Sequence, residues 1–146
     1  MILRYHFFLS IFLLLSEISC RSSKEYPADF KGDQIHFGQG GGFSGIVTHY
    51  VLLEDGRLFQ KAYRDSSFTF LTNWSSDFVK QMFSNYHLLQ LDKIEMYEPG
   101  DLYYFIEYHT GDKDIHRVTW GRPGTKPDDN IVIFYNLLYR STKSKL

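Results

Sequence analysis

Residues 46–63 read I-V-T-H-Y-V-L-L-E-D-G-R-L-F-Q-K-A-Y and carry the clearest fold signal of the sequence. Two apolar runs rich in β-branched and aromatic residues flank Asp55-Gly56. An Asp-Gly pair between such runs is the strongest short signal of a β-hairpin, because a type I′ turn needs a positive φ at both central residues. A two-residue turn at this point predicts that Leu53 pairs with Leu58. The stretch therefore indicates antiparallel strands joined by a tight turn.

Further strands follow, and their connections are short. Residues 68–71 alternate as a third strand. Residues 102–109 and 115–120 read as a second hairpin around a turn at residues 110–113. Short connections of this kind join antiparallel strands and leave no room for the crossover helices of a parallel sheet.

Two amphipathic helices are expected, one after each group of strands. Residues 76–87 place apolar side chains at three- and four-residue spacing, and Ser75 can cap the helix. A second helix opens near Pro127. The apolar stripes consist of Phe78, Val79, Met82, Phe83 and Tyr86 in the first helix and of Ile131, Phe134, Tyr135, Leu138 and Tyr139 in the second. This order predicts a single α+β domain over residues 34–146, an antiparallel sheet built from hairpins with two amphipathic helices packed on one face.

A glycine-rich segment precedes the first hairpin. Residues 38–45 read G-Q-G-G-G-F-S-G, and residues 40–45 fit the pattern G-x-G-x-x-G. A dinucleotide-binding turn leads from a strand into a helix, whereas a strand follows here, so the match does not predict a nucleotide site. The segment is either a flexible or bulged entry to the first long strand or a ligand loop whose N–H groups form a small anion nest. The candidate loop residues are Gly40, Gly41, Gly42 and Ser44.

The N-terminal segment differs in kind from the rest of the chain. Arg4 precedes a short apolar run at residues 7–15, and small or polar residues lead from there to Cys20, the one cysteine of the chain. A charged start, an apolar stretch of this length and a small-residue exit are typical of a secretory signal peptide. The run is too short for a membrane-spanning helix. Residues 1–19 are therefore predicted to be a signal peptide.

This segment resembles the signal of bacterial lipoproteins, with a relaxed lipobox in which Ser19 is the typical residue before Cys20. The resemblance covers residues 1–20 only. It implies that the thiol of Cys20 is joined to diacylglycerol. The residues that follow are polar, lack periodicity and include Pro27, so residues 20–33 are predicted to be a lipid-anchored tether between membrane and domain. The expected location is the bacterial cell envelope, periplasmic or surface-exposed, with the membrane contacted through the lipid anchor. Plain secretion is the alternative.

Aromatic residues make up 18% of the chain and crowd one of the strands. Alternate side chains of a strand point to opposite faces, so Tyr103, Phe105, Glu107 and His109 share one face. Because Glu107 and His109 favour solvent, this face is expected to be exposed. Tyr103 and Phe105, with the nearby Trp120, would then form a surface for a protein or sugar partner. The favoured alternative is that the N-terminal segment covers this face or that the face simply tolerates exposed aromatic residues.

The sequence shows no spacing typical of a metal site or a catalytic centre. His109 and His116 flank a turn and could approach each other across it, but two histidines make an incomplete zinc site. The favoured interpretation is that they are solvated polar residues beside the turn. Ser44 does not lie in a G-x-S-x-G motif. We therefore expect no catalytic residues, no metal and no cofactor. The formal net charge of −1 gives no reason to expect nucleic acid as a partner.

These observations lead to three hypotheses of function. The first is a small, non-enzymatic, lipid-anchored domain of the cell envelope that acts through protein–protein interaction. The second is a glycan- or small-ligand-binding module that uses the glycine loop and Trp120. The third is a hydrolase, which would need histidines and carboxylates clustered in a pocket.

Overall fold

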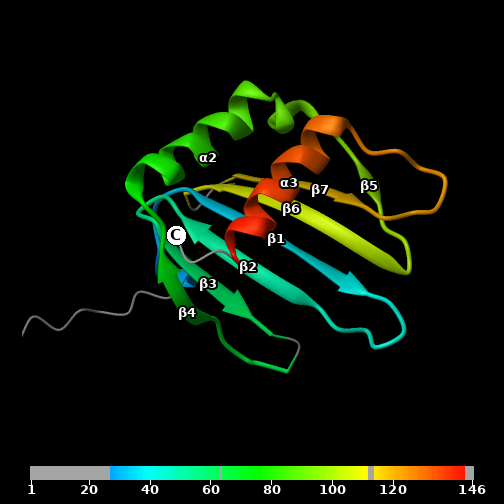
Figure 1. Ribbon diagram of the computed structural model, residues 1–146, viewed down its shortest axis with the longest axis horizontal. Helices are drawn as coiled ribbons and strands as arrows, with labels where there is room; N and C mark the ends of the chain where they lie inside the picture. The colour runs from blue at the N-terminus through cyan, green and yellow to red at the C-terminus, as the bar shows by residue number, and fades with distance from the viewer. Residues whose placement is uncertain (1–26, 63, 112–113, 144–146) are drawn as a thin grey trace, which may run out of the picture.

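The computed structural model describes residues 27–62, 64–111 and 114–143. These residues form a seven-stranded sheet in the order β4-β3-β2-β1-β6-β7-β5, and two helices cover one of its faces (Figure 1). The strands are β1 (Gln34–Gly41), β2 (Thr48–Leu53), β3 (Arg57–Lys61), β4 (Thr69–Asn73), β5 (Tyr97–Glu98), β6 (Leu102–Thr110) and β7 (Asp114–Trp120). Neighbouring strands are antiparallel except for β5 and β7. The predicted α+β class is confirmed.

Both predicted helices are present. α2 (Ser76–Leu88) follows β4, and α3 (Asp129–Ser141) ends the domain. The Asp128 carboxylate caps α3 by accepting a hydrogen bond from the Asn130 N–H at 2.8 Å, whereas Ser75 stands at the N-cap of α2 without a side-chain cap. No helix in the described part of the chain is long and apolar enough to cross a bilayer.

The hydrophobic core lies between the two helices and one face of the sheet. Alternate residues of each strand reach this face, so the core takes Ile35 and Phe37 from β1, and Tyr104, Ile106 and Tyr108 from β6. The apolar sides of α2 and α3 form the other layer of the core, opposite the sheet. Its buried members are Val79, Met82 and Tyr86 from α2 and Ile131, Phe134, Tyr135 and Leu138 from α3.

The first hairpin exists, but its predicted register is wrong. Leu58 pairs with Leu52 and not with Leu53. Gly56 has a φ of +97°, while Gln90 is the single non-glycine residue with a positive φ in the described segments, so Asp55 does not adopt the conformation of a type I′ turn. The longer loop turns Leu52 and Leu58 toward the helices together. A one-residue slip would move one of the two side chains to the opposite face.

The first half of the glycine-rich segment, residues 38–41, belongs to a central strand, and residues 42–45 form the turn that leads to β2. β1 includes Gly38 and Gly40 and pairs with both β2 and β6. Gly38 lies opposite Phe105, and Gly40 lies opposite Tyr103. A Cβ atom at Gly38 would stand 3.0 Å from the Phe105 ring, and one at Gly40 would stand 2.6 Å from the Tyr103 hydroxyl. The missing side chains therefore make room for aromatic rings of the neighbouring strand, an arrangement that stabilises glycines in sheets.

Residues 27–33, which were expected to belong to a tether, pack against the sheet face opposite the helices. Pro27 is buried in the 3-10 helix η1 (Pro27–Asp29), and Phe30 packs on a small apolar cluster. The cluster consists of Val51, Leu53 and Phe59. The Gln34 side-chain amide donates to the carbonyl oxygens of Pro27 at 3.0 Å and Phe30 at 3.3 Å. This segment thus covers part of the second face.

Candidate functional site

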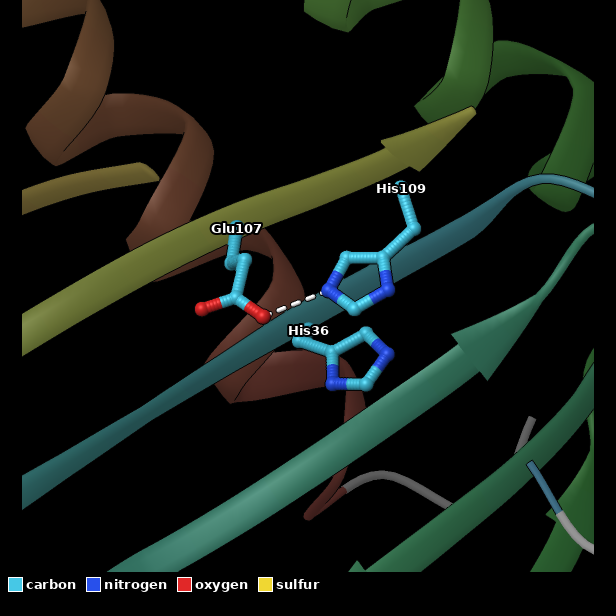
Figure 2. A group of neighbouring side chains, drawn as sticks. All are labelled: His36, Glu107 and His109. Carbon is cyan, nitrogen blue, oxygen red and sulfur yellow. Dashed lines mark hydrogen bonds and ion pairs between the residues drawn. The ribbon is translucent and has the colours of Figure 1, made fainter. Parts of the chain in front are cut away.

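Three histidines and a glutamate meet on the sheet face opposite the helices. His49 comes from β2, His36 from β1, and Glu107 and His109 from β6. We call these four residues the histidine cluster. Figure 2 shows the side chains of His36, Glu107 and His109 pointing toward one another from the two adjacent strands.

Strand register brings these residues together. His36 lies directly opposite Glu107, and Gln34 lies opposite His109. On the other side of β1, His49 lies opposite Gly38. His49 and His109 are thus diagonal neighbours of His36, and long side chains at such positions can touch. The small Gly38 leaves the space that the His49 ring and its neighbour Phe105 occupy, with ring centroids 5.2 Å apart.

A chain of hydrogen bonds fixes the proton positions of His36. The Gln34 amide nitrogen is held by two carbonyl oxygens, so its Oε1 accepts, and His36 Nε2–H donates to it at 3.0 Å. His36 Nδ1 is then left with a lone pair, which accepts from His49 Nε2–H at 3.0 Å. Both rings are neutral in this arrangement.

Burial keeps the two rings neutral over a wide pH range. Removal from water lowers the pKa of His36 to about 3, and the neighbouring His109 and His49 add to the effect. Burial likewise lowers the pKa of His49 to about 4. Neutral imidazoles offer one donor and one acceptor each, which suits them to bind a polar ligand or a metal ion.

Glu107 is the anion of the cluster. Burial on its own would raise the pKa of Glu107, but the hydrogen bond from His109 and the nearby positive charges hold that pKa at about 2. His109 Nε2 lies 2.5 Å from Glu107 Oε1, and Arg117 donates to Oε2 at 2.9 Å. The Arg117 guanidinium also lies over the Phe105 ring, 4.7 Å from its centroid.

A cavity of about 280 Å³ opens beside the cluster. Gln34, His36 and His109 form its polar part, and its apolar lining comes from Pro27, Phe30, Phe68 and Ile115. The segment before β1 therefore builds one wall of the cavity, and the histidine rings build another. Apolar walls with a few convergent polar groups are typical of small-ligand sites.

A second hollow of about 580 Å³ lies beside α2 and is lined by Asp33, Glu54, Asp55, Lys80, His87 and Tyr108, among others. Of its charged side chains, those of Glu54, Asp55 and Lys80 are exposed to solvent. Solvated charges bind ligands weakly. The smaller cavity, with the buried His36 and the half-buried His109 in its wall, is the better candidate site.

The expected aromatic surface is not exposed as predicted. Phe105 is 3% exposed and Trp120 is 7% exposed. Phe105 is covered by Arg117 and His49, and Trp120 lies on the helix-covered face, stacked on Tyr104. Strand alternation explains the difference for Trp120, because it pairs with Tyr104 and must share the face of that residue. Tyr103 is half-buried over Gly40.

The glycine residues of the predicted ligand loop are divided between two elements. Gly40 and Gly41 belong to β1, and Gly42 and Ser44 lie in the exposed turn that follows. The Gly42 N–H donates to the Asp101 carbonyl at 2.6 Å and so already has a backbone partner. Anion binding by this turn stays a prediction.

His109 and His116 do not meet, so the approach of the two rings that the sequence allowed does not occur. His116 pairs with Tyr108 and therefore points to the helix side, where its Nδ1 accepts from the Tyr86 hydroxyl and its Nε2 donates to the Ile94 carbonyl. His109 points to the opposite face. The register of β6 and β7 pairs His109 with Ile115, and a shift of one residue would be needed to pair it with His116. Cys20 and the predicted signal peptide lie outside the described residues.

Sequence reasoning missed His36 and His49 as members of a site. The pairing of β1 with β6 joins residues about seventy positions apart, and no local spacing records it. A signal was nevertheless present, because the apolar Ile35 and Phe37 alternate with His36 and Gly38 as the two faces of a half-buried strand do. The chain matches no protein-family model and no curated protein, so the site stands on its own geometry.

Proposed function

We propose that this protein is a cell-envelope lipoprotein whose folded domain binds a small ligand at the histidine cluster. The observation that carries the proposal is the cavity of about 280 Å³ whose polar wall is formed by His36, His109 and Gln34. Ligand sites in proteins are concave, largely apolar and equipped with a few fixed polar groups. This is the ligand-binding hypothesis from the sequence, moved from the glycine loop to the opposite end of β1.

The cluster is suited to binding because its polar groups are held in place before a ligand arrives. His36 is fixed by Gln34 and His49, and Glu107 is fixed by His109 and Arg117. Groups held in this way lose little conformational entropy when they bind. The cavity is small, which restricts the ligand to a small molecule, an ion or the end of a larger molecule.

The proposed location rests on the N-terminal segment. A lipid on Cys20 would attach the domain to the membrane through the short segment that precedes Pro27. Two or more acyl chains are needed for firm anchoring. In this arrangement the domain samples ligands next to the bilayer surface.

Binding can be tested by nuclear magnetic resonance of the histidine rings. We expect a ligand from a panel of amino acids, sugars and cell-wall fragments, added in the presence of EDTA, to shift the ring signals of His36 and His109. The signal of His87, which is exposed on α2, serves as the internal control. A panel in which no compound moves the cluster signals, or in which His87 moves equally, would count against the proposal.

A protein partner is the second candidate function, and the edge strand β4 favours it. All five residues of β4 are exposed, and they carry no charge, whereas most natural edge strands are protected by charge or proline. A partner strand could pair with this edge. Phe70→Lys should then abolish cross-linking to the partner in cells, while Phe43→Lys in the exposed β1–β2 turn should not. Equal cross-linking of both variants would exclude the edge.

A further inference from the structure

We propose that the histidine cluster holds one divalent transition-metal ion, with His36, His109 and Glu107 as ligands. This inference rests on the proposed function, because it names the ligand class of the same site. Imidazole nitrogens with a carboxylate oxygen are the donor set that zinc and its first-row neighbours prefer. The three residues each place one donor atom within 4.8 Å of the other two (Figure 2).

The donor atoms of the three residues must move closer together to bind one ion, since they now lie up to 4.8 Å apart. Zinc binds histidine nitrogen at about 2.0–2.1 Å and carboxylate oxygen at about 2.0–2.2 Å, so the donors of a tetrahedral site stand roughly 3.3 Å apart. The strand backbones are held by the ladder, so side-chain rotations must bring the donor atoms to this spacing. His36 and Glu107 are direct partners in the β1–β6 ladder, which pairs residues along the full length of β1.

Gln34 acts as the outer partner that metal-bound histidines commonly have. It accepts the proton of His36 Nε2 at 3.0 Å, and its own amide is held by the carbonyl oxygens of Pro27 and Phe30. The lone pair of His36 is thereby placed on Nδ1, which faces His49. His49 Nε2 lies 3.0 Å from this atom, near the spacing of two ligands of one ion, so His49 is the best placed fourth ligand.

Several existing contacts must change when an ion binds. The hydrogen bond that His49 Nε2–H donates to His36 Nδ1 must break, because the ion takes the same lone pair, and His49 must release that proton to become a ligand itself. His36 and His109 are stacked, with planes inclined by 7°, so their lone pairs run parallel and cannot converge on one ion. One ring must turn, and His109 has the room because it borders the cavity. Arg117 must also move away from Glu107, because its positive charge repels a metal ion bound to the same carboxylate. Its side chain is 43% exposed and can do so.

The test is a titration of the full chain, purified in detergent and freed of metal with EDTA. We expect one equivalent of Zn²⁺ to bind by calorimetry and Co²⁺ to produce the visible absorption of a four-coordinate site. His109→Ala and Glu107→Gln should each weaken binding about 10-fold or more. His87→Ala, a histidine on the exposed surface of α2, should leave the affinity unchanged.

Circular dichroism of each variant distinguishes a lost ligand from a lost fold, and Glu107→Gln keeps the shape of the side chain if His109→Ala does not fold. Absence of stoichiometric binding, or equal affinity in the wild type and Glu107→Gln, would overturn the inference. The outcome is separable from the proposed function. If the EDTA-treated protein binds an organic ligand at the cluster but no metal, the metal inference fails and the proposed function stands. If neither binds, both fail.

Discussion

The imidazole rings of His36 and His109 lie face to face, with centroids 4.0 Å apart and planes inclined by 7°. The rings belong to neighbouring strands and meet on the diagonal of the β1–β6 ladder. Two imidazolium ions at this distance would repel each other strongly in a partly dry environment. The arrangement is therefore compatible with at most one charged ring, and the buried His36 is the ring that stays neutral.

The buried histidines should make the stability of the metal-free protein depend on pH. The folded-state pKa values of about 3 for His36 and about 4 for His49 lie below the unfolded value of 6.5. The unfolded state therefore binds more protons below pH 6.5, so the stability is fully present above that pH and falls as the pH drops toward 4. Because unfolding then takes up two protons, one on His36 and one on His49, the free energy of unfolding falls by up to about 2.7 kcal/mol per pH unit.

Urea denaturation in EDTA at several pH values between 7 and 4 measures this slope. The variant His49→Phe removes one of the two titrating groups and should have about half the slope. Glu107 causes a further loss of folding stability below pH 4.5, because its folded pKa of about 2 lies below its ordinary value of 4.5. A flat profile between pH 6.5 and 4 would show that the two rings are not held neutral.

Gly38→Ala should destabilise the domain more than Gly40→Ala. A Cβ atom at Gly38 would stand 2.0 Å from the Thr48 carbonyl oxygen, which belongs to the backbone and cannot yield without moving β2. At Gly40 the nearest atoms are the end of the Tyr103 side chain, which can rotate away. Overpacking of this kind costs about 1–3 kcal/mol. Chemical denaturation of the two variants measures the difference, and equal midpoints would contradict it.

Tyr86→Phe should cost about 1–2 kcal/mol of folding free energy. The Tyr86 hydroxyl donates to His116 Nδ1 at 2.5 Å, and His116 Nε2 donates to the Ile94 carbonyl at 3.1 Å. Without the Tyr86 hydroxyl, the partly buried His116 Nδ1 has no hydrogen-bond donor. Tyr97→Phe is the matched control, because Tyr97 is 72% exposed on the edge strand β5. The prediction fails if both variants unfold at the same urea concentration.

Cys20→Ala should release the protein from the membrane fraction. Cys20 is the one cysteine of the chain and carries the proposed lipid anchor. The expected mass of the native protein is that of a chain beginning at Cys20 plus its acyl groups. Fractionation of cells and intact-mass measurement provide the two readouts. A native product without added acyl mass, or one that retains residues 1–19, would refute the anchor.

Elements whose signals are local could be predicted from the amino-acid sequence alone. The apolar spacing of Val79, Met82 and Tyr86 predicted α2, because a helix repeats every 3.6 residues and its buried face must follow that period. Asp55-Gly56 predicted that a hairpin exists at this point. Together with the short connections, these signals were sufficient for the α+β class.

Features that depend on residues far apart in the sequence became visible in the folded structure and not before. β1 was not recognised, because glycine is depleted in strands, and its role became clear only when Phe105 and Tyr103 of β6 were seen to fill the space of the absent side chains. The register of the first hairpin, in which Leu52 pairs with Leu58, could not be predicted from the Asp55-Gly56 pair. The histidine cluster depends on the pairing of β1 with β2 and β6. Side chains separated by many residues are brought together by strand register, which results from the packing of the whole core and not from any local pattern.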